Sequence, residues 1–321
     1  MPATASQKSS LSRGYGIAFA SAAILSLTAI FIRQLTQTYG IPALVLAFWR
    51  EVFVVLTLLL ALMLLKPSLI RVERRHLRYL LAYGLLLAAF NAIWTLSVAL
   101  NGAAISTVLV FSSAAFTALL GRWLLKERLD WVKIVAVVAS LSGCVLVSGA
   151  LHTASRNANL VGIVTGLVSG LGYAGYSLMG RSASQRGLNP WTTVLYTFGF
   201  ATLFLLAFNL LPGGPLPGSA SSPADILWLR DSWAGWAALL ALAAGPTLGG
   251  YGLYTVSLSL LPSSIANLIV TVEPVFTAAI AYVLLHERFT GIQIAGSGLI
   301  LFGVAFLRMY EGWRERHFKM Q

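Results

Sequence analysis

The fold is decided by one stretch, Ser263-Ser264-Ile265-Ala266-Asn267-Leu268-Ile269-Val270-Thr271-Val272-Glu273-Pro274-Val275-Phe276-Thr277, which continues through apolar residues to Leu285. A helix of about 20 apolar residues crosses the hydrocarbon core of a bilayer, so this stretch is long enough to span one. Glu273 stands near its middle, where an ionised carboxylate costs several kcal/mol unless it is paired, protonated or hydrated. Pro274 has no amide hydrogen and clashes with the carbonyl of Val270. The stretch therefore predicts a membrane-spanning helix with a free backbone carbonyl, at Val270, beside a lone acid.

The composition of the whole chain agrees with this prediction. Of its 321 residues, 58% are hydrophobic and only 10% are charged, whereas a soluble domain carries about 25% charged residues. We therefore expect an all-α polytopic membrane protein. The net charge of +12 is interpreted first as a topology signal, so no nucleic-acid partner is expected. Cys144 is the single cysteine, which excludes an internal disulfide.

A window of about 19 residues finds ten candidate spans along the chain. They cover residues 14–32, 42–65, 77–100, 103–124, 130–150, 160–181, 190–211, 233–260, 262–285 and 290–310. The connection 212–232 is rich in Pro, Gly and Ser and is interpreted as a surface loop. Its last part, Ala224 to Trp233, is a candidate for a short helix in the membrane interface.

The distribution of Lys and Arg predicts the orientation. With the N-terminus inside, 17 of the 22 basic residues fall in cytoplasmic segments and four, Arg33, Arg156, Arg230 and Arg288, fall outside. The remaining one, Arg50, lies within a span. Basic residues concentrate on the cytoplasmic side of membrane proteins, so both termini are predicted to be cytoplasmic.

The chain also repeats itself. When it is shifted by 160 residues, 91–149 aligns with 251–309 without a gap and with 15 identities in 59 positions. Leu124-Leu125-Lys126-Glu127-Arg128 meets Leu284-Leu285-His286-Glu287-Arg288 in this alignment. Each unit has five spans, and because five is odd the second unit enters from the opposite side of the membrane. This is an inverted-topology repeat, which is typical of secondary transporters.

These features divide the chain into five parts. The predicted boundaries are a cytoplasmic tail at 1–13, a first five-helix repeat at 14–150, a linker at 151–159, a second five-helix repeat at 160–310 and a basic cytoplasmic tail at 311–321. The basic tail is expected to contact anionic membrane lipid.

The sequence resembles the drug/metabolite transporter superfamily, and within it the EamA-type ten-span carriers. The resemblance rests on the repeat, on the closing Leu-Leu-x-Glu-Arg turn of both halves, on Glu273-Pro274-Val275, on the glycines of the last helix of each half, and on Arg50 in span two. It implies a multi-pass carrier of the bacterial inner membrane with a central cavity between its halves. Such carriers most often export amino acids or related metabolites.

Two charged residues within spans are the sharpest candidates for a binding role. Glu273 is predicted to bind a proton or a cationic group of the substrate, and the alternative is a protonated side chain bonded to a neighbouring helix. Arg50 is predicted either to bind a substrate carboxylate or to extend toward the interface. Glu51 is adjacent to Arg50 and points about 100° away on a helix, so the two are not expected to pair; Glu51 is interpreted as an inter-helix partner.

Polar and aromatic residues in spans three, four, six, eight and nine are expected to line the cavity as a set, although ordinary packing is the alternative for any one of them. They are Asn91, Trp94, Ser112, Ser113, Tyr173, Tyr176, Tyr251, Tyr254, Asn267 and Thr271. Gly245, Pro246 and Pro274 are candidate gating residues because Gly and Pro permit helices to bend. Tight static packing is the alternative for the glycines.

Other chemistries find no support in these residues. No Lys follows a Gly, so no phosphate loop is expected, and the four His residues show no metal spacing. We therefore expect no cofactor, no metal and no enzyme; an intramembrane enzyme and a non-transporting scaffold are the weaker hypotheses. The predicted function is a secondary transporter that exports small metabolites by alternating access, with possible proton or cation coupling. The alternative is a carrier of organic cations or drugs with Glu273 as the anionic site, and a monomer is expected, or else a homodimer.

Overall fold

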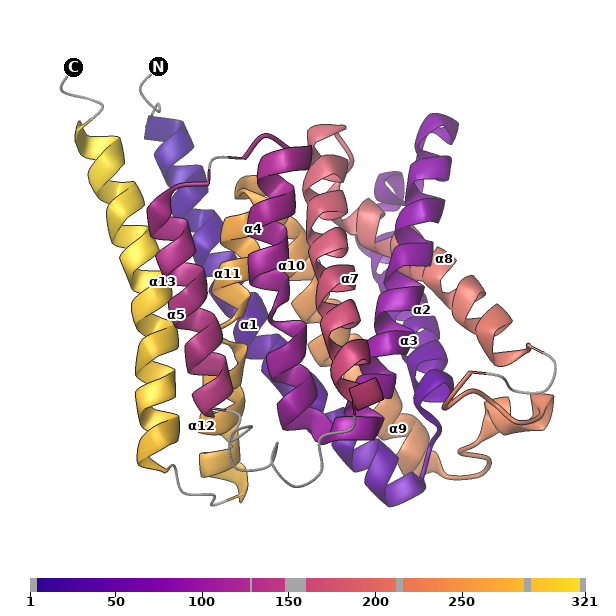
Figure 1. Cartoon of the computed structure of the whole chain (residues 1–321). Helices are drawn as coiled ribbons and strands as arrows, with labels where there is room; N and C mark the ends of the chain where they lie inside the picture. Colours follow the sequence, from indigo (N-terminus) through magenta and orange to yellow (C-terminus); the bar gives the residue numbers. More distant parts are fainter. Residues whose placement is uncertain (1–4, 128, 148–159, 212–215, 286–289, 318–321) are drawn as a thin grey trace.

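A computed structural model describes residues 5–127, 129–147, 160–211, 216–285 and 290–317. Within these ranges the regular structure is entirely helical, arranged as one bundle (Figure 1). The first half contains α1 (Ala5–Tyr39), α2 (Ala43–Leu65), α3 (Arg74–Val110), α4 (Ser113–Leu124) and α5 (Trp131–Val147). The second contains α7 (Leu160–Gln185), α8 (Pro190–Asn209), α9 (Trp233–Leu242), α10 (Leu248–Leu260), α11 (Ser263–Val270), α12 (Glu273–Leu285) and α13 (Gly291–His317).

The lengths and composition of these helices suit a membrane. Six described helical segments are long and apolar enough to cross one: Leu11–Tyr39, Ala43–Leu65, Arg74–Ser97, Val161–Gln185, Pro190–Asn209 and Trp233–Leu260. Three shorter apolar segments, Trp131–Leu146, Ser263–Thr277 and Ile294–Leu307, add to them. The prediction of an all-helical, polytopic membrane protein is confirmed.

Helix α3 is too long for a single straight span. Its 37 residues would extend for about 55 Å at 1.5 Å per residue, far beyond the bilayer core. The Ser97 hydroxyl nevertheless donates to the Ser106 hydroxyl at 3.0 Å, although nine residues of straight helix separate two groups by about 13 Å. The helical path must therefore double back between these serines, where the sequence predicted the gap between spans three and four.

The fourth span of each half is interrupted at the same aligned position. Helix α3 ends at Val110 and α4 begins at Ser113, while α11 ends at Val270 and α12 begins at Glu273. These positions correspond under the shift of 160 residues. Pro274 lies in the first turn of α12, where a missing amide hydrogen removes no helical bond. The sequence predicted one span over 262–285 with a free carbonyl, whereas the structure divides it into two helices just before Glu273. Helices α4 and α12 run from the centre toward opposite faces of the bundle (Figure 1).

The last helices of the two halves, α5 and α13, pack through reciprocal close contacts. A Cβ on Gly143 would lie 2.6 Å from the Gly296 carbonyl oxygen, and a Cβ on Gly303 would lie 2.8 Å from the Ala136 carbonyl oxygen. Gly143 aligns with Gly303 and Ala136 aligns with Gly296, so one contact is the image of the other. As residue numbers rise on α5 they fall on α13, which is antiparallel packing about a local two-fold relation.

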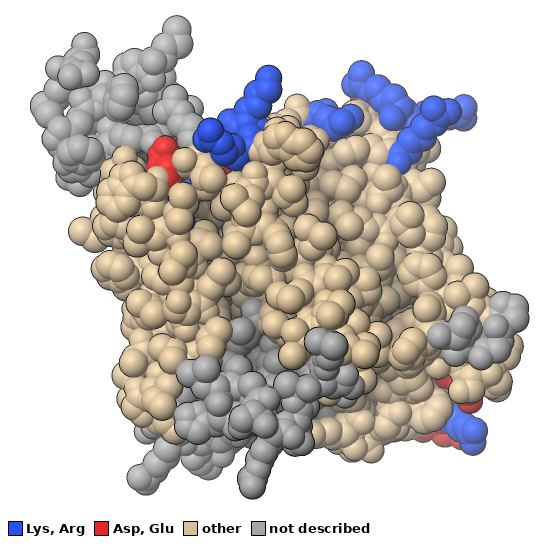
Figure 2. Space-filling model, viewed as in Figure 1, with Lys and Arg blue, Asp and Glu red and all other residues tan. Residues whose placement is uncertain are grey.

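The basic side chains gather at one face of the bundle. Figure 2 shows Lys and Arg along its upper edge, which is the side where α1 begins and α13 ends (Figure 1). The helix predicted for Ala224 to Trp233 is instead a 3₁₀ turn at Pro223–Leu227, followed by a turn that reaches α9. The linker 151–159 and the second closing turn, 286–288, lie outside the described residues.

Substitution at Gly143 tests the reciprocal helix contact. Gly143→Ala places a methyl group against a backbone oxygen, and we expect a loss of about 1–3 kcal/mol of stability. Gly298→Ala on α13 is the matched control, because nothing lies within 4 Å of its added Cβ. Thermal unfolding in detergent should show a lower Tm for Gly143→Ala than for Gly298→Ala; equal values would contradict the packing described.

Candidate functional site

The helices enclose a central cavity of about 50 Å³. It draws its lining from both halves: Leu25, Thr28, Arg50, Phe90, Trp94, Val110, Phe111, Tyr173, Tyr251 and Glu273. The space is small beside the roughly 300–1,000 Å³ of typical ligand pockets. A metabolite would enter only if the lining side chains moved apart, so the structure shows a contracted site.

Glu273 brings a carboxylate to this cavity. It is the first residue of α12, so the interruption of the span places it at a helix start, where the helix dipole favours a negative charge. Its side chain is half-buried, and it makes no hydrogen bond or ion pair with a described residue that would neutralise it. A carboxylate with these surroundings is available to a proton or to a cationic group.

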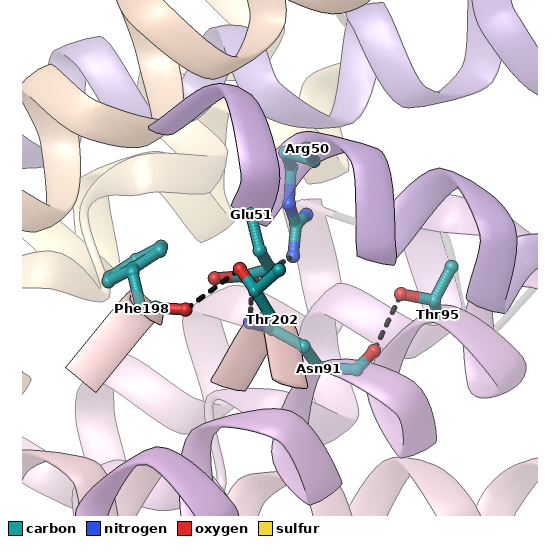
Figure 3. A network of polar contacts seen from close by, with 6 residues as sticks. All are labelled: Arg50, Glu51, Asn91, Thr95, Phe198 and Thr202. Carbon is teal, nitrogen blue, oxygen red and sulfur yellow. Dashed lines mark hydrogen bonds and ion pairs between the residues drawn. The ribbon is translucent and has the colours of Figure 1, made fainter. Parts of the chain in front are cut away.

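Arg50, on α2, brings a guanidinium to the same cavity, and Figure 3 shows it beside Glu51. It is 1% exposed, and its Nη2 lies 3.4 Å from Oε1 of Glu51. The same Glu51 oxygen accepts a 2.6 Å hydrogen bond from Nδ2 of Asn91 on α3. The prediction that adjacent Arg50 and Glu51 would not pair was wrong, because both side chains are long enough to bend toward one another. The expectation of an inter-helix role for Glu51 is confirmed.

Aromatic rings form much of the remaining wall. Phe90 and Tyr173 stack with their ring centroids 5.4 Å apart, and Tyr251 packs edge-on against the buried Tyr176. The indole nitrogen of Trp94 and the hydroxyl of Thr28 are buried without a hydrogen-bond partner among the described residues. Since buried polar groups are normally satisfied, these two donors are candidates for contact with a bound solute or water.

A second group of predicted residues lies behind the wall. The amide of Asn267 donates to Ser177 and accepts from Ser113 at 3.0 Å each, and Tyr254 shares its hydroxyl with Ser177 at 2.7 Å. Tyr176 meets the hydroxyl of Thr255 at 3.2 Å. This network ties α4 and α11 to α7 and α10.

The twelve predicted binding residues therefore separate into three groups. Five line the cavity: Arg50, Trp94, Tyr173, Tyr251 and Glu273. Five form the supporting layer: Asn91, Ser113, Tyr176, Tyr254 and Asn267. The hydroxyls of Ser112 and Thr271, which lie in the two breaks, donate to the carbonyls three residues earlier, at Leu109 and Leu268. Phe90, Val110 and Phe111 line the cavity but were not singled out from the sequence, since they look like any apolar residue of a span.

The predicted gating residues lie at two helix interruptions. Gly245 and Pro246 fall in a π-helical turn, Ala243–Thr247, between α9 and α10. Such a turn accommodates a proline that would break a regular α-helix. No atom lies within 4 Å of a Cβ built on Gly245, so close packing does not explain this glycine. Pro274 stands at the start of α12. Their movement stays a prediction.

Sequence reasoning missed a latch between the halves, which consists of Glu127, Ser263 and Ser264. Just beyond the end of α4, Lys126 has φ 55° and the Glu127 amide donates to the Gly121 carbonyl at 3.0 Å. This tight reversal directs Glu127 toward the start of α11. The Glu127 carboxylate accepts hydrogen bonds from the backbone amides and the hydroxyls of both serines, at 2.6–3.2 Å. The available signal in the sequence was the glutamate of the Leu-Leu-x-Glu-Arg turn, which recurs at the end of both halves.

Removal of Glu127 tests the latch. Glu127→Ala takes away the cap of α11, and since a cap contributes about 1 kcal/mol, we expect the amides of 263–266 to exchange hydrogen about fivefold faster or more. Asp225→Ala is the control, because Asp225 caps the amide of Ser222 in a separate loop. Hydrogen-exchange mass spectrometry on both variants provides the measurement. Unchanged exchange at α11 in Glu127→Ala would contradict the role given to this carboxylate.

The sequence of this chain is similar to those of known membrane transporters. The model of the EamA-like transporter family matches twice, at residues 12–149 and 160–309. An uncharacterized transporter of Synechocystis, sll1319, is 26% identical over 70% of this chain and 64% of its own length. The threonine/homoserine exporter RhtA of Salmonella typhimurium is 27% identical over 71% and 70%. An Archaeoglobus fulgidus uncharacterized transporter is 28% identical over 48% of each chain.

The chain thus spans about half to two thirds of the length of the first curated relatives that it matches. A protein crystal structure shares the fold with a TM-score of 0.73 at 16% identity, over 93% of this chain and 97% of that one. The curated relatives described above are all named as transporters or exporters. A helical bundle with a central cavity agrees with such a role. The chain belongs to the EamA-like transporter family, within the drug/metabolite transporter superfamily.

Proposed function

We propose that this protein is a secondary carrier that exports small metabolites, with amino acids as the best candidates. The observation that carries the proposal is the central cavity, which holds one guanidinium, Arg50, and one carboxylate, Glu273. A free amino acid carries one negative carboxylate and one positive ammonium group. Its carboxylate would pair with Arg50, its ammonium with Glu273, and its side chain would lie against the aromatic wall. The likeness to a threonine/homoserine exporter supports this cargo class.

We propose alternating access between two inverted halves as the mechanism. The reciprocal contacts of α5 and α13 and the opposite courses of α4 and α12 support an inverted repeat. The latch of Glu127 with Ser263 and Ser264 lies toward the basic face, so it would close the cavity on the cytoplasmic side. In the aligned positions of the first half stand Ala103 and Ala104, which lack the hydroxyls. The two gates are therefore unequal by sequence.

A carrier of organic cations is the second candidate, and one observation favours it. Arg50 already has the negative Glu51 beside it, whereas Glu273 makes no ion pair with a described residue. With Arg50 neutralised, the cavity would present one net negative charge and an aromatic wall, which suits a cation. In either case we expect a protein of the inner membrane that functions as a monomer, with a homodimer as the alternative, and that exchanges a proton or cation at Glu273.

A ligand panel separates the two candidates. Thermal-shift measurements in detergent should show stabilisation by zwitterionic amino acids, because a ligand that binds the native state raises its Tm. Glu273→Gln should weaken amino-acid binding about tenfold or more, since a buried ammonium would lose its counter-charge. Asp231→Asn, an exposed acid of the loop, should leave binding unchanged. Stabilisation by hydrophobic cations alone would favour the second candidate.

The proposed orientation has its own test. Fluorescent-protein fusions at the C-terminus should be bright in bacterial cells, because both termini are proposed to be cytoplasmic, where the reporter folds. Alkaline phosphatase, which is active only outside the cytoplasm, should be inactive at the same position. Active phosphatase there would contradict the orientation and, with it, the side that is assigned to the latch.

A further inference from the structure

Glu51 is a buried charge beside the cavity that the proposed binding of an amino acid does not use. It lies on α2, is 0% exposed, and does not belong to the cavity lining. Burial of a carboxylate in the membrane interior costs several kcal/mol unless other groups compensate. Here Arg50 and Asn91 do so through a single oxygen, Oε1. The other oxygen, Oε2, has no hydrogen-bond partner among the described residues.

The bond between Arg50 and Glu51 is loose. Charge-assisted N–H···O bonds are typically about 2.7–2.9 Å long, whereas Nη2 lies 3.4 Å from Oε1. A guanidinium has five N–H donors, yet Arg50 directs one nitrogen at Glu51, and its buried Nε has no partner among the described residues. Arg50 is thus neutralised by Glu51 without being saturated, and it still lines the cavity.

The shorter contact belongs to Asn91, whose amide donates to Oε1 at 2.6 Å (Figure 3). This bond fixes the Glu51 carboxyl from α3 whether or not Arg50 stays beside it. A protonated Glu51 keeps the bond, because a neutral carboxyl retains acceptor capacity. Glu51 can therefore lose its partner Arg50 without leaving its place, provided that a proton replaces the guanidinium charge.

Among the described residues, no charged side chain other than Arg50 forms an ion pair with Glu51. The phenols of Tyr176 on α7 and Tyr251 on α10 are within electrostatic reach of Glu51, and Tyr251 is also within reach of Glu273. Of the other elements packed on α2, α8 contributes the titratable Tyr196, which donates instead to the carbonyl of Ile70. Tyr83 of α3 donates to the carbonyl of Tyr176. In the described residues α9 and the π-helical turn are uncharged.

We propose that Glu51 is a positioning residue that holds Arg50 in the empty carrier, and that a proton on Glu51 releases Arg50 to the carboxylate of the cargo. The inference rests on the proposed function and narrows it to cargo with a carboxylate. Two carboxylates around one guanidinium in a low dielectric repel each other, so one of them takes up a proton. The proton comes from water, bonds to a Glu51 oxygen as cargo binds, and returns to water as cargo leaves.

This arrangement couples cargo and proton with a defined sign. Binding of a carboxylate takes up a proton at Glu51, so low pH strengthens binding. An ammonium group at Glu273 does the opposite, because a proton on that acid competes with it. A ligand with a carboxylate and no amine isolates the Glu51 effect from the Glu273 effect.

The test uses the purified full chain in detergent with 3-hydroxybutyrate and 4-methylpentanoate, one polar and one apolar carboxylate. In the unsubstituted protein, affinity should rise as the pH falls from about 8 to 6, by up to about tenfold per pH unit for one linked proton. A pH-indicator dye in weak buffer should report up to about one proton taken up per ligand bound. Glu51→Gln mimics the protonated acid, so it should bind with a flat pH profile and no proton uptake.

Thr202→Val is the matched control, because the Thr202 hydroxyl donates to the carbonyl of Phe198 on its own helix and forms no hydrogen bond with Glu51 in the described part of the chain (Figure 3). It should behave like the unsubstituted protein. Glu273→Gln covers the case in which Glu51→Gln fails to fold: proton uptake that persists in Glu273→Gln supports Glu51 as the acceptor. Proton uptake that is lost in Glu273→Gln, or kept in Glu51→Gln, overturns the inference.

Different results would contradict the proposed cargo class and the proposed role of Glu51. If carboxylates and amino acids bind to the unsubstituted protein without proton uptake, the proposed function stands and the role of Glu51 is wrong. If the unsubstituted protein binds neither carboxylates nor amino acids at any pH in this range, the proposed cargo class is wrong, and the role of Glu51 falls with it.

Discussion

The constraint on which this structure depends is the burial of charge inside a membrane. A lone carboxylate or guanidinium in the membrane interior raises the free energy of the folded protein, so such groups occur mainly at functional sites. Here Arg50, Glu51 and Glu273 lie at or beside one small central cavity. Both halves contribute a charged side chain to this cavity. Helix α2 supplies Arg50, and α12, which follows the break after α11, supplies Glu273.

The interruptions explain how polar groups come to lie at the centre of the bundle. A continuous helix would satisfy its own backbone and present only side chains, whereas the breaks at 111–112 and 271–272 expose helix ends in the centre of the bundle. Irregular backbone within a membrane is tolerated where protein or a hydrated cavity surrounds it. The paired breaks and the reciprocal glycine contacts give the two halves the same design, while Ser263 and Ser264 against Ala103 and Ala104 make them unequal.

Much of this could be read from the sequence, because the membrane limits the possibilities. Apolar length predicted the helices, Pro274 indicated a free backbone carbonyl beside Glu273, and the charges within spans pointed to Arg50 and Glu273. The pairing of Arg50 with Glu51 could not be read in this way: helical angles describe where side chains start, and long flexible ones can still meet. The latch between Glu127 and Ser263 joins residues 136 positions apart, and the width of the cavity depends on how all the helices pack.

The most direct measurement of the central claim is counterflow in proteoliposomes that contain only this protein. Vesicles loaded with unlabelled amino acid should accumulate the labelled compound from outside, and single substitutions Arg50→Gln and Glu273→Gln should each reduce the rate about tenfold or more. We expect counterflow to require both charges. Undiminished counterflow in the double variant, Arg50→Gln with Glu273→Gln, would contradict it.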